Sequence, residues 1–388
     1  MSNQAAAFGA RASVGFAGTF VPLALQLAFL PVWLSEIGFS GEAIGTLLGA
    51  ALAARIVAVP PLVTLSDRFP SKRLAFVGYA ALTFAAGTLL LIDQRWAIVI
   101  AVIVVSVGGA ALVPIADSVA LGGVRSHGLR YGRMRLWGSL AFVAATLGGG
   151  WWIERAGFTA VPFALVATLA LSLAAGFALP ATRNAPASER MPVRDLVRDR
   201  VLLVGIVSGA VTVSTHATFY AFASIHWATL GFDATLIGWF WTIGVVAEVA
   251  LFAAVGKRFS PRPFTLLACG ALAAAIRWAT FPLNGGTTFY VVNSVLHAGT
   301  FAAAYLGTQQ LIADRVKSSA HGAAQGLTQL IAGPTTAILT VASGWLYARH
   351  GAQAFLLPAA IGALAFAMLF LRLQPQRAGE GGDTIEPE

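Results

Sequence analysis

Twelve runs of apolar residues, each near the length of a membrane-spanning helix, succeed one another along the 388-residue chain. Crossing a hydrocarbon core of about 30 Å takes about 20 residues of α-helix, because each residue rises about 1.5 Å. Only 11% of the residues are charged, too few to coat a water-facing surface, so an all-α integral membrane protein is expected. The predicted spans are Ala12–Leu34, Ala43–Leu65, Leu74–Ile92, Trp96–Leu121, Leu136–Ile153, Phe158–Leu179, Val201–Trp227, Ala234–Val255, Pro263–Phe281, Thr288–Ile312, Gly322–Leu346 and Ala354–Leu373.

A stretch near the middle of the chain returns close to its end. Gly150–Gly157 reads G-W-W-I-E-R-A-G, and Gly344–Gly351 reads G-W-L-Y-A-R-H-G, 194 positions later. Ile44-Gly45 likewise recurs as Ile237-Gly238, at an offset of 193. Matches in order, at an offset close to half the chain length, predict two like-oriented halves, and such a duplication is typical of transporters.

A polar stretch, Pro180–Arg200, separates the sixth predicted span from the seventh and carries three prolines and five arginines. It divides the chain into an N-terminal six-helix bundle (1–179), a cytoplasmic linker (180–200), a C-terminal six-helix bundle (201–373) and a cytoplasmic tail (374–388). The two bundles are expected to be parallel repeats of one another.

The basic residues fall on one side of the predicted membrane. With the N-terminus placed in the cytoplasm, twenty of the 25 Lys and Arg residues lie in cytoplasmic segments, three lie in outer loops and two lie inside spans. Because cytoplasmic loops are enriched in Lys and Arg, this bias supports twelve spans with both termini in the cytoplasm. Topology therefore accounts for the net charge of +9, and no nucleic-acid partner is expected.

Several segments carry a family resemblance. Tyr131–Ser139 (Y-G-R-M-R-L-W-G-S) is similar to the signature of the phenylpropionate permease family, a branch of the major facilitator superfamily near the lactose-permease type of proton symporter. Leu65–Arg73 resembles the superfamily's G-x-L-x-D-R-x-G-R-K/R loop, without its two glycines. Further segments similar to that family are Ser214–Tyr220, Gly244–Val249, Arg277-Trp278 and His297–Phe301.

This resemblance covers nearly the whole chain and implies the two-bundle fold of the superfamily. It also implies proton-coupled uptake of a small aromatic carboxylic acid, such as a phenylpropionate-like anion, across the bacterial cytoplasmic (inner) membrane. The expected partners are this organic anion, a proton and the lipid bilayer around a multi-pass monomer. No cofactor and no metal is expected.

Three polar residues inside predicted spans are candidates for proton coupling, namely Glu248, Arg277 and His297. A carboxyl group in the membrane can bind a proton and release it when a cation approaches, which makes Glu248 the leading candidate for proton carrier. Its alternative role is a permanent salt bridge that only fixes helix packing. For His297, a proton relay stands beside the alternative of an interhelical hydrogen bond. In lactose-permease-like symporters a carboxylate, an arginine and a histidine on the eighth, ninth and tenth spans form the coupling group, and these three residues fall on those spans.

Arg55, inside the second predicted span, is the candidate for holding an anionic substrate, because a guanidinium group can bind a carboxylate through two hydrogen bonds. The alternative is an ion pair with a membrane carboxylate, either Glu248 or Asp117. Substrate sites of such bundles lie near the midplane, between the halves. Four further residues are candidates for lining this site: His216, Tyr220, Gln26 and Trp137.

Charged residues toward the cytoplasmic side are candidates for an ion-pair latch that closes the inner gate and breaks when the gate opens. The alternative for the arginines among them is that they only set the membrane topology. The positive-inside rule does not account for an aspartate, because it concerns Lys and Arg alone. The candidates are Asp67, Arg68, Asp117, Arg133 and Arg135.

Small residues recur at every fourth position in two predicted spans. Gly41, Gly45 and Gly49 lie on the second span, and Gly322 with Gly326 on the eleventh. Such spacing lets helices approach closely, and in the resembled fold these two spans meet between the halves. Both rows are therefore expected at the interface that moves during transport.

The sequence also bears on functions other than transport of an anion. The sequence contains no H-E-x-x-H, G-x-S-x-G or G-x-x-x-x-G-K-[ST] motif and only one cysteine, so an embedded enzyme or a nucleotide-driven pump is not expected. An efflux pump, a sugar or nucleoside permease, or a non-transporting sensor of the same fold remains an alternative. Arg55 argues against efflux of cations, because a positively charged guanidinium group in the binding pocket would repel a cation.

Overall fold

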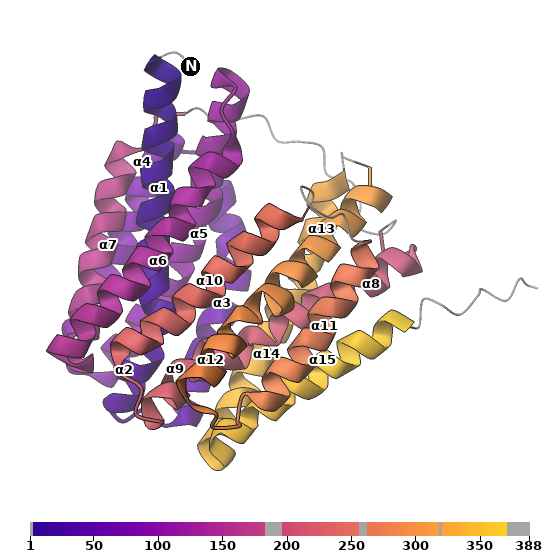
Figure 1. The fold of residues 1–388 in the computed structure, drawn as a ribbon. Coiled ribbons are helices and arrows are strands. Elements are labelled where there is room, and N and C mark those ends of the chain that lie inside the picture. The colour runs from indigo at the N-terminus through magenta and orange to yellow at the C-terminus, as the bar shows by residue number, and fades with distance from the viewer. Residues whose placement is uncertain (1–2, 183–195, 256–261, 318–319, 371–388) are drawn as a thin grey trace, which may run out of the picture.

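The computed structural model of the chain describes residues 3–182, 196–255, 262–317 and 320–370. Most of the predicted linker 180–200 and the whole predicted tail 374–388 lie outside the described residues. Across the described ranges the chain is helical and contains no strand, as the apolar pattern predicts (Figure 1).

The helices follow the predicted spans to within a few residues at most ends. Those of the N-terminal half are α1 (Asn3–Ala28), α2 (Leu30–Glu36), α3 (Gly41–Ser66), α4 (Lys72–Gly87), η1 (Thr88–Leu91), α5 (Arg95–His127), α6 (Tyr131–Ala156), η2 (Phe158–Ala160) and α7 (Val161–Ala178). Those of the C-terminal half are α8 (Arg200–Ser214), α9 (His216–Thr229), α10 (Ala234–Ala254), α11 (Pro263–Thr280), α12 (Gly286–Val295), η4 (Ala298–Ala303), α13 (Ala304–Arg315), α14 (His321–His350), η6 (Gly351–Phe355) and α15 (Leu356–Met368).

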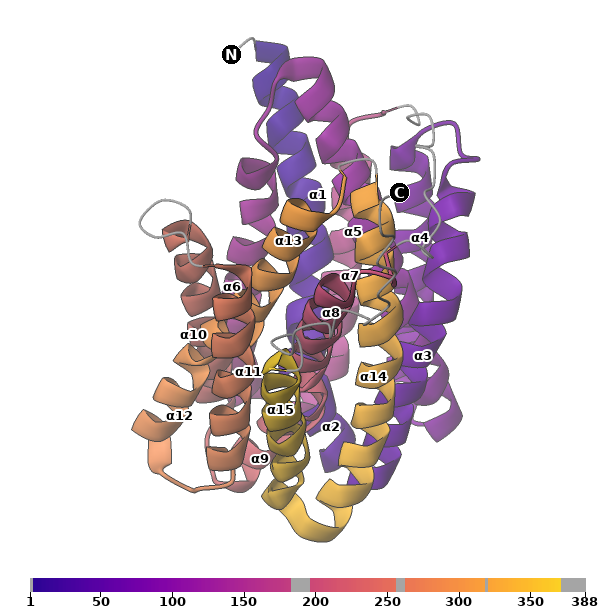
Figure 2. The same cartoon turned by 90° about the vertical axis from the view of Figure 1, so that its right-hand side faces the viewer.

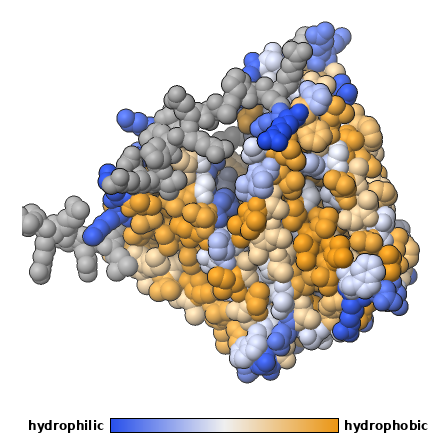
Figure 3. Space-filling model, turned by 180° about the vertical axis from the view of Figure 1, so that it is seen from behind, coloured by the Kyte–Doolittle hydropathy of each residue, from blue (hydrophilic) through white to orange (hydrophobic). Residues whose placement is uncertain are grey.

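Eleven helical segments of the described chain are long and apolar enough to cross a membrane. The last of them runs from His321 to Met368 and contains both α14 and α15, joined by η6. Figure 3 shows hydrophobic side chains over much of the surface between the two ends of the molecule, as expected of a protein surrounded by lipid. The count of twelve spans and the cytoplasmic location of both termini stay predictions.

Three of the predicted spans are interrupted. The first breaks at Phe29 between α1 and α2, where Pro31 lies in the first turn of the second helix. The seventh breaks at Thr215, whose hydroxyl bonds a carbonyl oxygen in the last turn of α8 (2.6 Å) and so competes with the helix ladder. The tenth contains a π-helical turn, η4, directly after His297. The second and third breaks place His216 and His297 at helix ends inside the C-terminal half.

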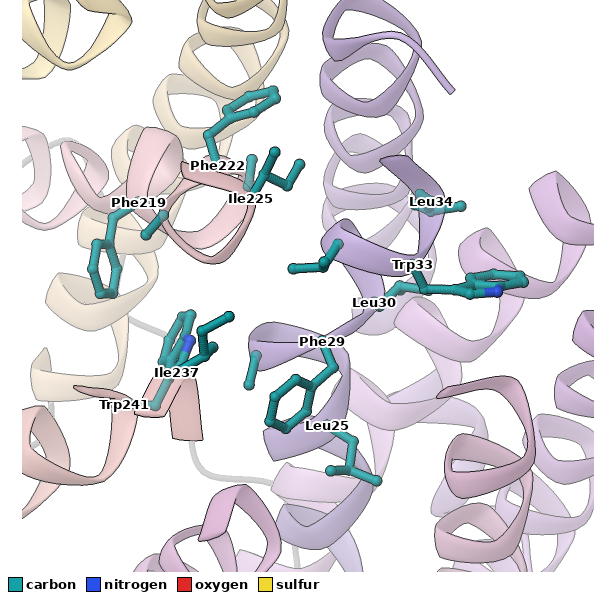
Figure 4. Packing of buried hydrophobic residues seen from close by; sticks show 14 of the residues in the cluster. Leu25, Phe29, Leu30, Trp33, Leu34, Phe219, Phe222, Ile225, Ile237 and Trp241 are labelled. Carbon is teal, nitrogen blue, oxygen red and sulfur yellow. The ribbon is translucent and has the colours of Figure 1, made fainter. Parts of the chain in front are cut away.

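Apolar side chains gather in three clusters, and their positions describe the conformation. We call the end of the bundle that holds Asn3 proximal and the opposite end distal. At the proximal end each half has a core of its own, which includes Phe16, Phe76 and Ile115 in one half and Leu202, Leu267 and Leu311 in the other. The distal cluster combines the two halves and includes Leu25, Phe29, Trp33, Phe219, Phe222 and Ile237 (Figure 4).

The two halves are therefore joined at the distal end and packed separately at the proximal end. Figure 1 shows them diverging toward the end that carries the N-terminus. Opening this end would expose the apolar side chains of the distal cluster to water, which is unfavourable, so the cluster keeps this conformation closed on that side.

Helices α3 and α14 form the first of two seams between the halves, and Figure 2 shows them side by side. Gly45 and Gly344 meet in it, since a Cβ atom on Gly45 would lie 2.5 Å from the Gly344 Cα. The whole row Gly41–Gly49 faces α14, so its predicted contact with the other half is confirmed. The same prediction is wrong for Gly322 and Gly326 in this conformation, because a Cβ atom on either would meet no atom within 4 Å. These two glycines lie at the proximal end, where the halves diverge.

Helices α6 and α10 form the second seam. Gly238 packs against the carbonyl oxygen of Thr146, and Gly150 packs against that of Ala234. Both glycines are the repeat counterparts of the two that meet in the first seam. The repeat seen in the sequence thus marks the two places where the halves approach most closely.

Candidate functional site

A buried cation organises the interior of the C-terminal half. Arg277 of α11 is fully buried, and its Nε donates to the Asn293 Oδ1 (3.1 Å). Its Nη1 donates to the Thr300 Oγ1 (3.1 Å) and to the His297 Nδ1 (3.3 Å). Its Nη2 has no hydrogen-bond partner among the described residues. All of these acceptors are neutral or basic groups, so the guanidinium charge is not neutralised by a directly bonded carboxylate.

Aromatic rings cover the faces of this guanidinium. The Arg277 Cζ lies 4.3 Å from the ring centroid of Trp278 and 4.6 Å from that of Phe219. The Trp278 ring is held by a hydrogen bond from its Nε1 to the Thr215 Oγ1 (2.9 Å), at the break between α8 and α9. Cation–π contacts of a desolvated arginine are worth about 2 kcal/mol, so the rings stabilise the charge that no carboxylate balances.

Glu248 of α10 lies on the other side of His297. The His297 Nε2 is 3.4 Å from the Glu248 Oε2, and the two side chains are 10% and 20% exposed. The π-helical turn that follows His297 widens the backbone locally, and such turns are frequent at functional sites. His297 thus contacts both the buried guanidinium and the carboxyl group, as the spans on which the three residues fall had suggested.

His216 and Tyr220 complete this group. His216 is fully buried, its Nε2 lies 3.0 Å from the Thr300 Oγ1, and its ring centroid is 5.1 Å from that of His297. The Tyr220 ring is 5.7 Å from the His216 ring and lies within electrostatic reach of Glu248 and Arg277. Five of the predicted site residues are therefore brought together: Glu248, Arg277, His297, His216 and Tyr220.

Two members of this network, Asn293 and Thr300, were missed in the sequence. Both are neutral, and a neutral polar side chain stands out less in an apolar span than a charged group or a histidine. Asn293, His297 and Thr300 are spaced at i, i+4 and i+7, which places them on one face of a helix. A row of three polar residues in a single apolar span was the signal that could have found them.

The N-terminal half presents its own polar group toward Glu248. Arg135 of α6 lies within electrostatic reach of Glu248 and of Tyr305 in the opposite half. The Tyr131 hydroxyl donates to the Asp117 Oδ1 (2.8 Å), and Arg135 also interacts electrostatically with Asp117. Two of the predicted gate residues therefore lie together, and the structure adds Tyr131 as the hydrogen-bonded partner of the aspartate.

The remaining predicted residues are not joined to these groups by any hydrogen bond or ion pair within the described part of the chain. Arg55 and Gln26 are half-buried and make neither kind of contact there. Trp137 is 55% exposed. Arg68 and Arg133 are exposed as well.

Asp67 pairs with a residue that was not predicted for it. Its Oδ1 is bonded to the Nζ of Lys72, which is 5% exposed and also donates to the Ser66 Oγ (2.9 Å). This ion pair joins the end of α3 to the start of α4 within one half. Among the described residues, no group of three His, Cys, Asp or Glu side chains is arranged to hold a metal ion.

Known proteins resemble this chain over most of its length. The model of the MFS_1 like family matches residues 17–357. The chain is 30% identical over 376 residues to the "Probable 3-phenylpropionic acid transporter" of Escherichia coli (strain K12), which covers 93% of this chain and 96% of that protein. It is 29% identical over 306 residues to the "Maltose permease" of Geobacillus stearothermophilus, with 75% and 76% covered.

Solved structures share the fold at low sequence identity. The nucleoside transporter NupG superposes with a TM-score of 0.79 at 14% identity, covering 95% of this chain and 99% of that one. A POT family transporter in complex with 5-aminolevulinic acid gives 0.68 at 11% identity, covering 94% and 95%. A bacterial homolog of the human lysosomal transporter Spinster, in an inward-facing and unoccupied conformation, gives 0.67 at 12% identity, covering 96% and 97%. At these identities the likeness shows the fold alone.

Proposed function

This chain belongs to the MFS_1-like family, and from that premise we propose that it is a proton-coupled symporter that takes up a small organic anion by alternating access. Family and relatives make it a secondary membrane transporter rather than an enzyme. The name of the Escherichia coli relative refers to 3-phenylpropionic acid. We therefore propose an aromatic carboxylate of that kind as the substrate class.

The observation that carries proton coupling is the contact of Glu248 with His297 inside a bundle of apolar helices (3.4 Å). A carboxyl group can exchange a proton, and a cation that approaches stabilises its ionised form. One cation acts on Glu248 in this conformation, Arg135 of the opposite half, while the buried Arg277 lies beyond His297. Rocking of the halves changes the distance from Arg135 to Glu248, which would couple protonation to the conformational cycle.

For the anion we propose the cations of the N-terminal half. Arg55 has no bonded partner among the described residues, which leaves its guanidinium group available to a substrate carboxylate. Arg135 is a second candidate for binding the anion, because it interacts electrostatically with Glu248 across the boundary between the halves. The aromatic body of the substrate would then lie toward Tyr220 and Trp137, with Gln26 and His216 as hydrogen-bonding groups.

Alternating access is supported by the way in which the halves pack. The distal cluster seals one end, and the separate proximal cores leave the halves free to approach each other at the other end. With the proximal end placed in the cytoplasm, this conformation faces inward. Asp117, Arg133 and Arg135 belong to the proposed inner gate, whose closure would bring α6 toward the C-terminal half, while Asp67 and Arg68 would act from the loop after α3.

A permease for a neutral solute is the alternative, since one relative is named a maltose permease. The two proposals differ in the need for a cation at the substrate. A neutral sugar does not require Arg55, whereas a carboxylate loses its counter-charge when that residue is removed.

Uptake into proteoliposomes under an imposed proton gradient tests the coupling. Labelled phenylpropionate should accumulate when the outside is acidic, and Glu248→Gln should abolish accumulation while exchange of substrate across the membrane continues. Glu36→Gln, which alters an exposed carboxylate at the end of α2, is the matched control and should behave as the wild type. Undiminished acid-driven accumulation by Glu248→Gln would remove Glu248 as the coupling residue.

The charge of the substrate is tested at Arg55. Replacing Arg55 by Ala should weaken the binding of phenylpropionate by about tenfold or more, because a charge-assisted hydrogen bond is worth about 1.5–3 kcal/mol. The control is Arg125→Ala, which removes an exposed arginine near the end of α5. If a direct binding assay gives the Arg55 variant and the wild type equal affinity, the role of anion binding would shift to Arg135. Accumulation of maltose in place of the acid would refute anion transport.

A further inference from the structure

The hydrogen bonds around Arg277 dictate which nitrogen of His297 carries a proton. A guanidinium group can only donate. Because Arg277 Nη1 donates to the His297 Nδ1 (3.3 Å), that nitrogen must be free of hydrogen. In a neutral imidazole the hydrogen then lies on Nε2, which faces the Glu248 Oε2 at 3.4 Å. His297 is held in this tautomer for as long as the contact with Arg277 persists.

The same reasoning fixes His216 in the opposite tautomer. Its Nδ1 lies 3.0 Å from the Val213 carbonyl oxygen, which can only accept, so this nitrogen carries a hydrogen. Its Nε2 lies 3.0 Å from the Thr300 Oγ1, which already accepts a hydrogen bond from Arg277. The Thr300 hydroxyl has one hydrogen and two acceptors within reach, the His216 Nε2 at 3.0 Å and the His297 carbonyl oxygen at 3.3 Å. Donation to the nearer of the two, the His216 Nε2, completes this tautomer.

A second proton on His216 has no counter-charge to support it. His216 is fully buried. It contacts the Thr300 hydroxyl, and the charged group bonded to that hydroxyl is the guanidinium of Arg277, which is positive. The ionisable groups around the two histidines are Glu248 from α10, Arg277 from α11 and Tyr220 from α9, with Arg135 acting on Glu248 from α6. A buried imidazolium beside a buried guanidinium, without a carboxylate in contact, is strongly disfavoured.

Passage of a proton through His297 is also blocked. A relay would accept a proton at one ring nitrogen and release it at the other. Here the His297 Nδ1 faces the Arg277 guanidinium, which stays protonated. A proton on Nδ1 would therefore point at an N–H of Arg277, and two donors repel each other. A proton relay through His297, the role considered for it from the sequence, is therefore not expected while these contacts persist.

We propose that Thr300, together with Arg277, is a positioning residue that holds His216 and His297 as neutral, opposite tautomers, so that neither histidine carries the transported proton in this conformation. Thr300 is suited to this role because its hydroxyl contacts both Arg277 and His216 and lies 3.3 Å from the His297 carbonyl oxygen. The π-helical turn η4 places Thr300 at this junction. The inference rests on the proposed proton coupling and leaves Glu248 as the proton carrier.

Nitrogen-15 spectra of histidine-labelled protein in lipid test the tautomers directly. The two signals are identified as those that disappear in His216→Gln and in His297→Gln. We expect hydrogen on Nδ1 of His216 and on Nε2 of His297, with no imidazolium signal for either residue at pH 6 to 8. An imidazolium, or the reverse tautomer, at either residue would overturn the inference.

Substitution of Thr300 separates a positioning role from a merely structural one. Thr300→Ser keeps the hydroxyl and should retain the wild-type spectrum and uptake. Thr300→Val should mix the tautomers of His216 and lower acid-driven accumulation by about tenfold, in line with the loss of a hydrogen bond to a charged group. Thr287→Val, which alters an exposed threonine at the start of α12, is the control. A Thr300→Val protein with the wild-type spectrum and the wild-type dependence of uptake on pH would refute the role of Thr300.

The proton-to-substrate ratio provides a test that does not depend on Thr300. If His297 does not carry the proton, His297→Gln should keep the wild-type ratio even where the rate of uptake falls. A ratio reduced to zero, with substrate exchange retained, would make His297 the carrier and overturn the inference. Absence of acid-driven accumulation in the wild type would instead refute the proposed symport, while the spectra would still decide the tautomers.

Discussion

The two seams between the halves are built from equivalent residues but are held together differently. In each seam a glycine of one half lies against the backbone of the other. The helix that contains the G-W pair also ends with the same contact in both seams. Arg155 donates to the Trp151 carbonyl oxygen (2.8 Å) and covers its ring, and Arg349 does the same with Trp345 (3.0 Å). The sequence repeat therefore corresponds to a repeated local structure at the distal end, where the halves meet.

The difference lies in polar contacts. In the second seam, between α6 and α10, the Thr146 and Thr242 hydroxyls are 2.9 Å apart and buried, and the Glu154 Oε2 accepts from the Ala234 N–H (2.8 Å). In the first seam, between α3 and α14, the polar contact is an ion pair of Arg349 with Glu42, at 3.6 Å between exposed side chains.

This difference separates the two seams by function. Directional bonds specify one relative position of two helices, whereas a glycine surface tolerates sliding. We expect the second seam to latch the distal end and the first to act as the smooth surface on which the halves rock. Ala348 and Gly41, the repeat counterparts of Glu154 and Ala234, make only a close backbone approach.

The largest effect is expected from closing the space in the first seam. A Cβ atom on Gly344 would lie 2.7 Å from the Gly45 Cα and 2.8 Å from the Gly41 carbonyl oxygen, and backbone atoms cannot rotate away. Gly344→Leu should therefore force the distal end apart, with a destabilisation of about 3 kcal/mol or roughly a hundredfold change in the ratio of open to closed protein.

Alkylation from outside would measure this opening. A reporter cysteine at Leu34, which is fully buried in the distal cluster, in a background that lacks Cys269, should react much faster in the Gly344→Leu protein. Gly326→Leu is the control on the same helix, because its side chain would meet open space. Equal reaction rates in the two variants would show that the first seam does not hold the distal end closed.

A smaller effect is expected from the latch of the second seam. The Glu154 carboxylate caps the first N–H of α10 from the opposite half, and Asp233 caps the same helix at Leu236 (2.7 Å). Glu154→Ala should favour the open distal end by about 1 kcal/mol, roughly fivefold in the alkylation rate, while Glu154→Gln retains an acceptor and should change it less. Glu36→Ala is the control, and a Glu154→Ala protein that reacts at the wild-type rate would contradict the latch.

The helices and their order could be predicted because the apolar pattern is long and strong. The predicted span Ala234–Val255 differs by one residue from α10, and the interruptions at Thr215 and after His297 were not foreseen. A hydroxyl that bonds a nearby carbonyl and a π-helical turn leave no mark in hydropathy. These breaks are local events decided by packing.

The candidate site was predictable only in part, because depth along a span does not fix the face of the helix. Glu248, Arg277 and His297 were found together, but Arg55, which also lies inside a predicted span, bonds none of them. Asp117 was expected to pair with an arginine; Arg135 does interact with it electrostatically, but its hydrogen bond comes from Tyr131, which was not predicted. Partners that depend on rotation about the helix axis, or on neutral side chains such as Thr300, require the packed structure.

The smallest effect is expected from the ion pair of the first seam, and it decides whether the two seams really differ. Arg349 and Glu42 are 43% and 56% exposed, and exposed pairs are worth about 0–1 kcal/mol. Glu42→Gln should therefore change the alkylation rate at the Leu34 reporter by less than about twofold, and high salt should abolish even that difference. A change as large as that of Glu154→Ala, persisting at high salt, would mean that both seams latch the distal end. The asymmetry between a sliding seam and a latching seam would then be wrong.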